Sequence, residues 1–536
     1  MKEFSQLINQ LILTRSRNRK IELLNHYFKN TENPDRGLAL AILTGNLKIK
    51  NISISKIKEL IKKEVDPELF DLSYDYVGDL AETIALIWPY KQKGKVPKLN
   101  FIINELENSS TTNITKLIKK YLSIFSENER WAFIKLLSGG LRIGVSTRLT
   151  KLSLIHNTTI EISEIEQIWH GVVPPYNKLF NWIFGKGAKP EIEVEKVFHP
   201  LMLAHPIEKK DFNNLNPTEF FAEWKWDGIR VQLVLFKSKI RIFSRTGDDI
   251  SNTFPEIKNN ENDLVVLDGE LLVGNNFKPF KFNKLQQRLN RKKVSKNHLE
   301  NFPAFVKLYD ILFLKNKDLR SLDFSERRNI LSEWHDKVQN KFFDLSEIFE
   351  FKTWENLKNI KSKKLNKSIH EGLMIKRKTS SYISGRPKGY WYKWKNDPLV
   401  VDAVMMYAQR GHGKRSSYYS DFTFGLWDQN NIVPICKAYF GFSNEELEIL
   451  DKFVRSNTIN KFGPVREVEK KFVVEIAFDS VDFSKRHKSG VALRFPRIKR
   501  LRRDKPINEV INIDLFKENF IEDFKSDANA PLASML

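Results

Sequence analysis

The chain has 536 residues, several times the usual length of a single domain, so two to four domains are expected. Hydrophobic residues make up 41% of the chain and aromatic residues 12%, which excludes a disordered protein. A formal net charge of +23 favours a polyanionic partner such as nucleic acid, although a generally basic proteome would give the same balance.

The single cysteine, Cys436, excludes an intramolecular disulfide and a zinc site made of clustered cysteines. Residues 1–30 lack the apolar stretch and the small-residue cleavage site of a signal peptide. No stretch has the length and apolarity of a membrane span. A cytoplasmic protein without membrane contact is therefore expected.

The first third of the chain carries the apolar periodicity of amphipathic helices. Its first helical stripe consists of Phe4, Leu7, Ile8 and Leu11. Further helices are predicted over Ile21–Phe28, Ile114–Phe125 and Ile165–Phe184. The run Gly185–Pro190 is rich in glycine and lysine, and it predicts a linker.

From about Val194 onward, strand patterns dominate. Strands are predicted over Ile229–Phe236, Ile240–Phe243, Leu264–Val273, Phe305–Phe313 and Tyr390–Trp394. A helix is predicted over Phe324–Trp334, so this part is expected to be an α+β domain.

The pattern pauses again at Asn396–Pro398. Beyond it, strands are predicted over Val401–Tyr407, Phe422–Trp427, Ile432–Phe440 and Phe472–Phe478. Several short strands with one or two helices favour a small barrel of the OB type. The small and polar tail Ser526–Leu536 is expected to fray.

The segment Glu223–Arg230, with the sequence EWKWDGIR, is the most informative stretch. In an extended strand residues two apart share a face, so Glu223, Lys225 and Asp227 line one side and two tryptophans the other. A lysine amine is a nucleophile only when neutral, and burial or nearby cations such as Arg230 favour that form. Alone the pattern is weak, because an Asp-Gly pair is equally typical of a hairpin turn.

Carboxylates interrupt two other strand patterns. Asp268 and Glu270 lie two residues apart in an apolar run, and Glu371 begins the run that ends at Lys376. Buried carboxylates are costly unless they meet a metal, a cation or a hydroxyl. Oxygen ligands from separate strands suit Mg²⁺, with substrate phosphates and water completing its coordination. The alternative is that these acids pair with neighbouring basic residues.

The segment Tyr390–Lys395 separates two faces. One face carries Tyr390, Tyr392 and Trp394, and the other carries Trp391, Lys393 and Lys395. Because two neighbouring lysines repel each other, we expect an anion between them, most naturally a phosphate. The alternative is a solvated basic strand.

In this order, the segments resemble the motif series of the covalent nucleotidyltransferases, and specifically of the ATP-dependent DNA ligases. The series runs through Glu223–Arg230, Phe243–Gly247, Leu267–Glu270, Val306–Ile311, Glu371–Lys376, Trp391–Lys395 and Arg494–Lys505. Outside this core, Lys135–Val145 is similar to a signature of the helical DNA-binding domain of such ligases, and His199–Ala204 to the entry of the nucleotidyltransferase domain. The resemblance is to bacterial ligases with the three-domain layout of archaeal and eukaryotic enzymes.

The resemblance implies a multidomain fold. An all-α DNA-binding domain would cover residues 1–190, and an α+β nucleotidyltransferase domain of the ATP-grasp-like ligase type would cover 191–398. A β-barrel OB-fold domain would cover 399–525, followed by a flexible tail over 526–536.

Carried over residue by residue, the resemblance implies that Lys225 attacks the α-phosphorus of ATP and becomes the lysyl-AMP. Glu223 would recognise the adenine edge, and Tyr309 would stack on adenine where the family often has phenylalanine. The remaining assignments are ribose or phosphate contacts from Arg230 and Arg245, ribose and metal contacts from Glu270 and Glu371, and α-phosphate contacts from Lys393 and Lys395. Arg386 is a further candidate nucleotide contact, although its loop differs in length from archaeal forms. The basic run around Arg500, Arg502, Asp504 and Lys505 would assist adenylation.

The AMP would then move to the 5′-phosphate at a nick, and the 3′-hydroxyl would expel it. The implied cofactors are ATP and Mg²⁺, with Mn²⁺ as an alternative metal. The implied partner is nicked double-stranded DNA, bound by a monomer in repair, replication or recombination. Rival interpretations are an RNA ligase or mRNA-capping guanylyltransferase, against which the helical N-terminal region argues, and a non-catalytic nick-binding clamp. An NAD⁺-dependent ligase is disfavoured because the cysteines of its usual zinc module are absent.

Overall fold

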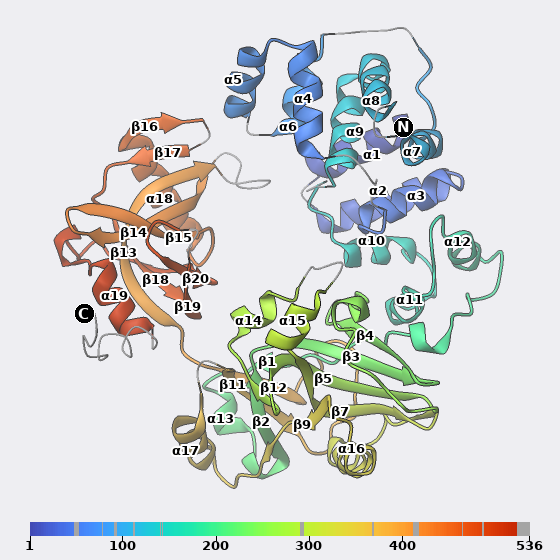
Figure 1. The fold of residues 1–536 in the computed structure, drawn as a ribbon, viewed down its shortest axis with the longest axis vertical. Coiled ribbons are helices and arrows are strands. Elements are labelled where there is room, and N and C mark those ends of the chain that lie inside the picture. Colours follow the sequence, from blue (N-terminus) through green and yellow to red (C-terminus); the bar gives the residue numbers. More distant parts are fainter. Residues whose placement is uncertain are drawn as a thin grey trace, which may run out of the picture. The chain divides into compact units, whose positions relative to one another are not determined.

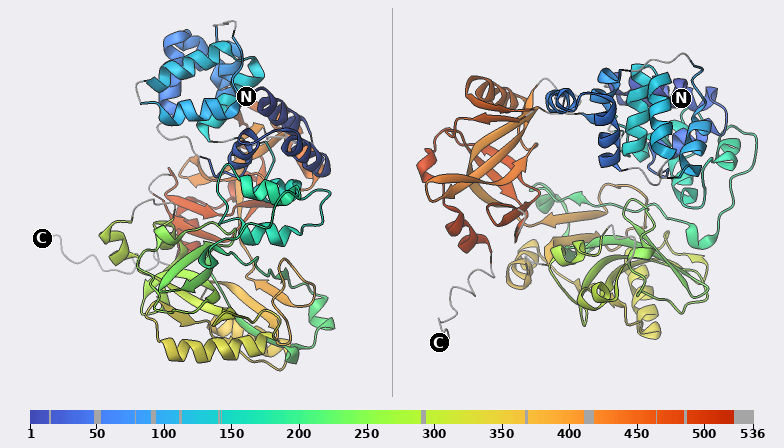
Figure 2. Two further views of the ribbon diagram at one scale, coloured as in Figure 1. Left: turned by 90° about the vertical axis from the view of Figure 1, so that its right-hand side faces the viewer. Right: turned by 45° about the horizontal axis from the view of Figure 1, so that its top comes forward.

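The computed structural model describes residues 1–14, 16–47, 53–77, 79–89, 94–110, 113–139, 141, 143–289, 294–366, 369–410, 418–463, 465–484 and 487–521. The chain forms two compact units: Met1–His156 together with Pro398–Leu536, and Asn157–Asp397. Figures 1 and 2 show the elements of each unit in chain order. No helix within the described ranges is long and apolar enough to cross a membrane.

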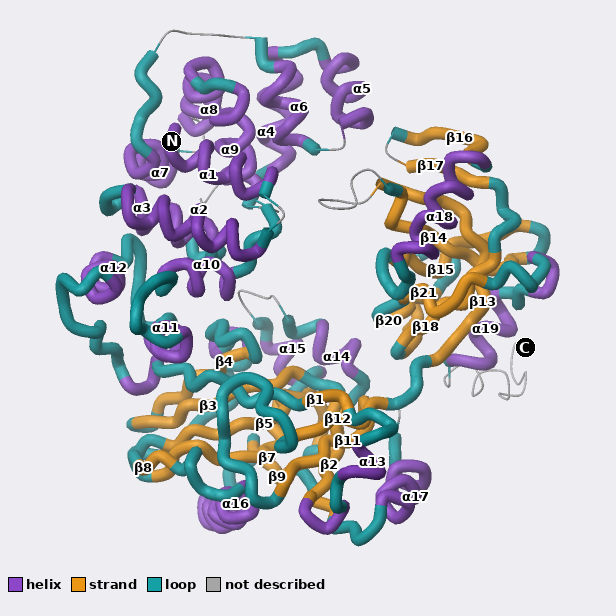
Figure 3. The backbone as a smooth tube through the Cα atoms, turned by 180° about the vertical axis from the view of Figure 1, so that it is seen from behind, coloured by secondary structure: helices purple, strands orange, loops and turns teal. Residues whose placement is uncertain are grey.

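The N-terminal part of the first unit is helical in its described residues (Figure 3). Its helices are α1 (Lys2–Leu13), α2 (Arg17–Asn30), α3 (Asp35–Leu43), α4 (Ile54–Glu64), α5 (Pro67–Val77), α6 (Leu80–Ile87), α7 (Leu99–Asn108), α8 (Asn113–Ile124), α9 (Glu127–Ser138) and α10 (Thr147–Leu154). The predicted stripe on α1 is confirmed, since Phe4, Leu7, Ile8 and Leu11 are all buried.

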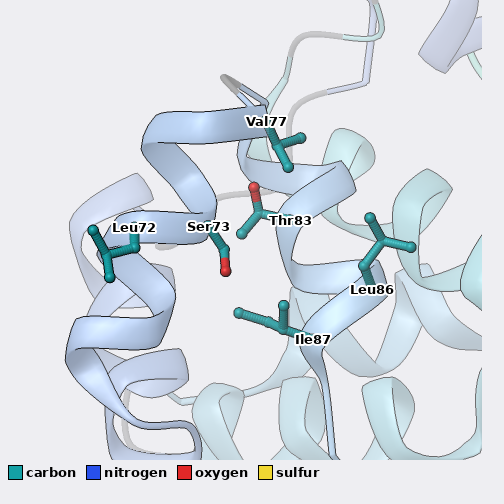
Figure 4. Close-up of a pocket in the computed structure, with 6 residues that line it drawn as sticks. All are labelled: Leu72, Ser73, Val77, Thr83, Leu86 and Ile87. Carbon is teal, nitrogen blue, oxygen red and sulfur yellow. The ribbon is translucent and has the colours of Figure 1, made fainter. Parts of the chain in front are cut away.

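A hollow lies between α5 and α6 (Figure 4). It is lined by Leu72, Ser73, Val77, Thr83, Leu86 and Ile87. Because no charged side chain is among these lining residues, the hollow does not suit a phosphate group.

The second unit begins with two short helices, α11 (Ile162–Ile168) and α12 (Asn177–Ile183). The prediction of one continuous helix over 165–184 is therefore wrong. The cause is the pair Pro174–Pro175, because proline lacks the backbone donor that a helix interior requires. Residues 185–190 contain no helix or strand, and they begin just after the C-cap of α12, Phe184.

Two sheets form the body of the second unit. The first sheet has the order β1 (His205–Pro206), β12 (Trp391–Lys395), β11 (His370–Arg377), β2 (Phe220–Trp226) and β10 (Ile348–Phe349). The second has the order β4 (Lys239–Ser244), β3 (Ile229–Phe236), β5 (Val265–Asn275), β7 (Ala304–Leu314) and β8 (Lys317–Asp318), with β6 (Lys278–Pro279) on β5 and β9 (Phe343–Leu345) on β7. The helices of this body are α13 (Asp211–Asn214), α14 (Phe282–Gln286), α15 (Lys296–Asn301), α16 (Phe324–Val338) and α17 (Trp354–Lys364).

Both faces of β3 and β5 are buried. Val231 and Leu233 pack into one core together with Leu331 and Trp334 of α16. A second core contains Val234 and Val266 of this sheet and Trp391 of the other sheet. A third core lies on the opposite face of the first sheet and includes Trp224, Leu373 and Tyr392. The α+β prediction for this part is consistent with these layers.

Helix α16 shows how the local sequence begins such an element. Its N-terminus is a capping box, in which the Asp323 and Glu326 side chains satisfy each other's backbone donors. Its buried face then packs on β7. The helix predicted over Phe324–Trp334 is therefore confirmed.

The C-terminal part is built on strands. One sheet has the order β15 (Asn431–Ala438), β14 (Tyr419–Asp428), β13 (Leu399–Arg410), β17 (Val465–Val468) and β16 (Thr458–Phe462), and β18 (Val473–Phe478) joins β13 to β21 (Arg497–Leu501). A separate hairpin pairs β19 (Ser480–Phe483) with β20 (Val491–Arg494). Helices α18 (Asn444–Ser456) and α19 (Ile513–Phe520) pack on the same core. The predicted C-terminal β domain is confirmed, and the predicted tail 526–536 lies outside the described residues.

Candidate active site

Lys225 lies one residue before the end of β2, where the chain crosses from one sheet to the other. Because β2 and β3 belong to different sheets, the Asp-Gly pair after β2 is a crossover and not a hairpin turn. The crossover passes so close to β5 that position 228 has room only for glycine, since a Cβ there would lie 2.6 Å from the Leu271 carbonyl oxygen and 2.8 Å from Glu270 Cγ. The crossover therefore brings Lys225 of the first sheet near Glu270 of the second.

The alternation predicted for β2 is confirmed as far as Trp226, whereas Asp227 lies beyond the end of the strand. Trp224 and Trp226 are buried in the core on one face. On the other face, Glu223 is 1% exposed and forms an ion pair of 2.7 Å with Lys376 of β11. The Lys376 ammonium also lies over the Tyr309 ring, 4.4 Å from its centroid. Glu223 is thus a buried acceptor held by a buried cation.

A β-bulge in β11 sets the direction of Glu371. His370 pairs with Trp226 and Gly372 pairs with Lys225, so Glu371 is an extra residue in the ladder. Its carboxylate forms an ion pair with the Lys225 ammonium. The direct contact of the Lys225 amine is therefore with a carboxylate and not with one of the cations expected around it.

Glycine is required at the bulge. Gly372 has φ +138, a conformation that side chains disfavour. A Cβ at this position would also overlap the Trp394 carbonyl oxygen of β12. The bulge therefore depends on Gly372 as well as on the extra residue.

Strand β12 brings further cations to the same end of the first sheet. Lys393 pairs with Met374 and Lys395 pairs with Gly372, which itself lies opposite Lys225. Lys395 is exposed, and its ammonium lies 3.7 Å from the Glu371 carboxylate. Burial lowers the pKa of Lys393, and so do the surrounding charges of Arg386, Lys395, Lys225 and Arg245. This set of cations has the chemistry to hold a phosphate.

Glu270 completes this end of the site from β5. Within the described residues it makes no hydrogen bond or ion pair through its carboxyl group. Burial raises the pKa of Glu270 to about 8, and the Glu371 carboxylate adds to this effect while Lys225 opposes it. Glu371 therefore contacts the Lys225 amine, and Glu270 lies close enough for its charge to interact with that amine.

Asp268 behaves differently from Glu270, although the two lie on the same strand. Arg230 donates to both Asp268 oxygens, at 3.0 and 2.6 Å, and the Tyr382 hydroxyl donates to Asp268 at 2.7 Å. Arg230 also donates to the Met202 carbonyl oxygen at 2.7 Å. For Asp268 the alternative of a paired acid is thus correct, and Arg230 is held in a fixed orientation.

The remaining candidate residues are placed by three different elements. Tyr309 lies on β7, and the Arg230 guanidinium lies 5.9 Å from its ring centroid. Arg245 is exposed in the turn after β4. Arg386 is exposed in the loop before β12, where its carbonyl oxygen accepts from His205 at 3.2 Å. Both arginines lie close enough to act on the charge of Lys393.

Sequence reasoning missed the residues that hold the others in place. Lys376 ends the motif Glu371–Lys376 but was given no role, and no sequence pattern pointed to Tyr382. His370, which stacks on Trp224 at 4.4 Å, and Asn396, which contacts the bulge, were also missed. Their contacts depend on pairing between distant strands, which a single sequence does not reveal.

The last basic motif lies on and after β21 in the C-terminal part. Arg502 and Lys505 both form ion pairs of 2.9 Å with Asp402 of β13. Arg500 lies 3.6 Å from Glu475. These cations are thus neutralised by acids of their own domain. In the N-terminal signature Lys135–Val145, Gly140 and Arg142 lie outside the described residues.

Three family models match consecutive parts of the chain: the DNA ligase N terminus over residues 1–153, the ATP dependent DNA ligase domain over 201–395, and the ATP dependent DNA ligase C terminal region over 415–505. The chain is 27% identical to a probable DNA ligase of Koribacter versatilis, over 98% of this chain and 97% of the relative. It is 25% identical to DNA ligase 1 of Korarchaeum cryptofilum, over 97% and 98% of the two chains.

Among solved structures, Pmar-Lig_PreS3 matches the fold with a TM-score of 0.58 at 19% identity, over 93% of this chain and 99% of that chain. The family matches follow the order of the helical, two-sheet and C-terminal β parts described above. The chain therefore belongs to the ATP-dependent DNA ligases, the enzymes that seal nicks in DNA.

Proposed function

We propose that Lys225 is the nucleophile that takes AMP from ATP, and that the enzyme seals nicks through this lysyl-AMP. The observation that carries the proposal is the position of the Lys225 amine, which contacts Glu371 beside the cations of β12 and lies within electrostatic reach of Glu270 on the second sheet. In the first step the Nζ–phosphorus bond forms, the bond to pyrophosphate breaks and the amine loses a proton. The AMP then passes to the 5′-phosphate of the nick, and attack by the 3′-hydroxyl releases it.

The cations around Lys393 would stabilise the charge that develops on the phosphate oxygens in each transfer. Lys393 and Lys395 lie on the strand next to β11 and would hold the α-phosphate. Arg245 and Arg386, both exposed, would contact the nucleotide from the loops at this end of the sheet. The fixed guanidinium of Arg230 would contact the ribose or a phosphate.

The adenine end of the site would be formed by Glu223 and Tyr309. An ionised Glu223 can only accept hydrogen bonds, which suits the amino group of adenine and disfavours the carbonyl oxygen of guanine. Tyr309 would stack on the base, and such stacking contributes about 1–3 kcal/mol. Lys376 holds the Glu223 carboxylate in place through the ion pair described above.

Glu270 and Glu371 fit a divalent cation, since both offer carboxylate oxygens from separate strands and Glu270 has no competing partner among the described residues. Within the described ranges, no group of three or more acidic, histidine or cysteine side chains is placed so that it could hold a metal ion by itself. Phosphate and water would therefore supply the other ligands, which favours Mg²⁺, or Mn²⁺ in its place. Bound there, the metal would offset the charge on the ATP phosphates.

We further propose three domains, with limits at residues 190 and 398, and an ATP-grasp-like core in the middle one. The mixed strand order and the helix α18 support an OB-type barrel in the last domain. The helical domain and the barrel would bind nicked duplex DNA through its phosphates, because a ligase acts on any sequence. We expect a monomer that serves repair, replication or recombination.

The decisive experiment is incubation of the protein with α-labelled ATP and Mg²⁺, followed by a denaturing gel. Wild-type protein should retain an acid-labile adenylate, and Lys225→Ala should retain none. Lys358→Ala, an exposed lysine on α17, is the matched control and should label like wild type. A label that persists in Lys225→Ala would overturn the assignment of the nucleophile, and a wild-type protein that never labels would favour a non-catalytic nick-binding clamp.

A further inference from the structure

The carbonyl groups on both sides of the Glu371 Cα are held by one residue, Asn396. The Asn396 side-chain amide donates to the His370 carbonyl oxygen at 3.0 Å. The Asn396 backbone N–H donates to the Glu371 carbonyl oxygen, also at 3.0 Å. Because these two carbonyls belong to successive peptide planes, the two bonds together fix the direction in which the Glu371 side chain leaves the backbone.

That direction matters because the regular ladder would place Glu371 elsewhere. Beyond the bulge, Leu373 and Ile375 point into the core that contains Trp224 and are fully buried. If the regular alternation continued back from Leu373, Glu371 would share the face of Leu373 and Ile375, and its carboxylate would point into that apolar core. The bulge instead turns Glu371 toward Lys225.

We propose that Asn396 is a positioning residue for catalysis, which holds the bulge so that Glu371 faces the Lys225 amine. The inference rests on the proposed role of Lys225 as nucleophile. Asn396 follows β12 directly, so the strand that carries Lys393 and Lys395 also aligns the carboxylate of β11. The side-chain bond is the part that mutation can remove, since the backbone bond remains in any variant except proline.

Two substitutions separate this role from simple packing. Asn396→Asp keeps the size of the side chain but sets a carboxylate oxygen against the His370 carbonyl oxygen, so acceptor faces acceptor. Asn396→Ala removes the donor without adding repulsion. If Asn396 has a positioning role, the single-turnover rate of lysyl-AMP formation should be highest in wild type, lower in Asn396→Ala and lowest in Asn396→Asp. The Asn396→Asp rate should be about tenfold or more below wild type, the equivalent of one strong hydrogen bond. If Asn396 only fills space, Asn396→Asp should form lysyl-AMP at nearly the wild-type rate and Asn396→Ala should be the slowest variant.

A double-mutant cycle with Glu371→Gln tests whether Asn396 acts through Glu371. In the Glu371→Gln background, Asn396→Asp should change the rate of lysyl-AMP formation by less than about twofold, because the carboxylate that it positions is already lost. Asp397→Asn, an exposed neighbour, is the matched control and should label at the wild-type rate.

The inference is overturned if Asn396→Asp labels as fast as wild type, or if it slows labelling by the same factor in both backgrounds. If Asn396→Asp does not fold, Asn396→Ala replaces it in the double-mutant cycle. It should then slow labelling in the wild-type background but not in the Glu371→Gln background, and any other result overturns the inference. Failure of the proposed function looks different, since it requires that the wild-type protein does not label or that Lys225→Ala does.

Discussion

The buried pair of Lys376 and Glu223 allows a quantitative prediction for Lys376→Met. Both side chains are 2% exposed, and their charged atoms lie 2.7 Å apart. At an effective dielectric constant of about 20, this separation corresponds to an attraction of about 6 kcal/mol, much of which offsets the cost of removing both charges from water. Methionine keeps the aliphatic stem and removes the charge, which leaves Glu223 as a buried carboxylate without its ion-pair partner.

Breaking a buried pair in this way costs about 3–5 kcal/mol, whereas replacing both partners by neutral groups is often close to neutral. Amide hydrogen exchange in peptides that cover β2 and β11 reports on this region alone. We expect exchange to accelerate by roughly 10²–10⁴-fold in Lys376→Met, and to return most of the way toward wild type in Glu223→Gln/Lys376→Met. Exchange within about threefold of wild type in the single variant, or a double variant as labile as the single one, would refute the reasoning.

Three further predictions concern the bulge, the free carboxyl group and the DNA contacts. Gly372→Ala should abolish lysyl-AMP formation because its Cβ would overlap the Trp394 carbonyl oxygen. Gly385→Ala is the control and should retain this activity, since Gly385 also has a positive φ, +87, but has open space around the added Cβ. Equal labelling of the two variants would contradict the prediction. The pKa of Glu270 is raised to about 8, so the metal-free folded state binds a proton more tightly than the unfolded state, and its stability falls as the pH rises from about 4.3 toward 8. Glu270→Gln cannot ionise, so its Tm advantage over wild type in EDTA should be larger at pH 8.5 than at pH 5, and parallel Tm profiles would exclude the effect. Affinity for nicked duplex DNA should fall steeply and linearly on a log–log plot against salt concentration, and an affinity that barely changes would exclude phosphate-dominated binding.

The parts of the fold that follow from local periodicity could be predicted from the sequence. The stripe on α1, the alternation along β2 and the helix after Asp323 all depend on residues that are neighbours in the chain. The contact between Glu371 and Lys225 was not predicted, because the two residues are 146 positions apart and the family resemblance assigned Glu371 only to ribose and metal contacts.

What could not be predicted depends on pairing and on turn geometry. The Asp-Gly pair after Trp226 has the same local sequence whether it closes a hairpin or crosses between sheets, and only the strand partners decide. The turn between β3 and β4 has positive φ at both Lys237 and Ser238, a conformation that glycine and asparagine usually signal and these residues do not. The bulge at Glu371 is likewise invisible, since a single added residue leaves the apolar pattern of β11 almost unchanged.

Because of the bulge, the direction of the Glu371 side chain depends on the number of residues in β11. Loss of His370 would restore an unbroken ladder, and the Glu371 carboxylate would then face the apolar core behind the sheet. In a surface loop such a deletion would be harmless, but here it would abolish ligation without replacing any residue assigned a catalytic or binding role. When related genes are compared, a one-residue gap at this point is therefore a sharper sign of lost ligation than many substitutions in the same strand.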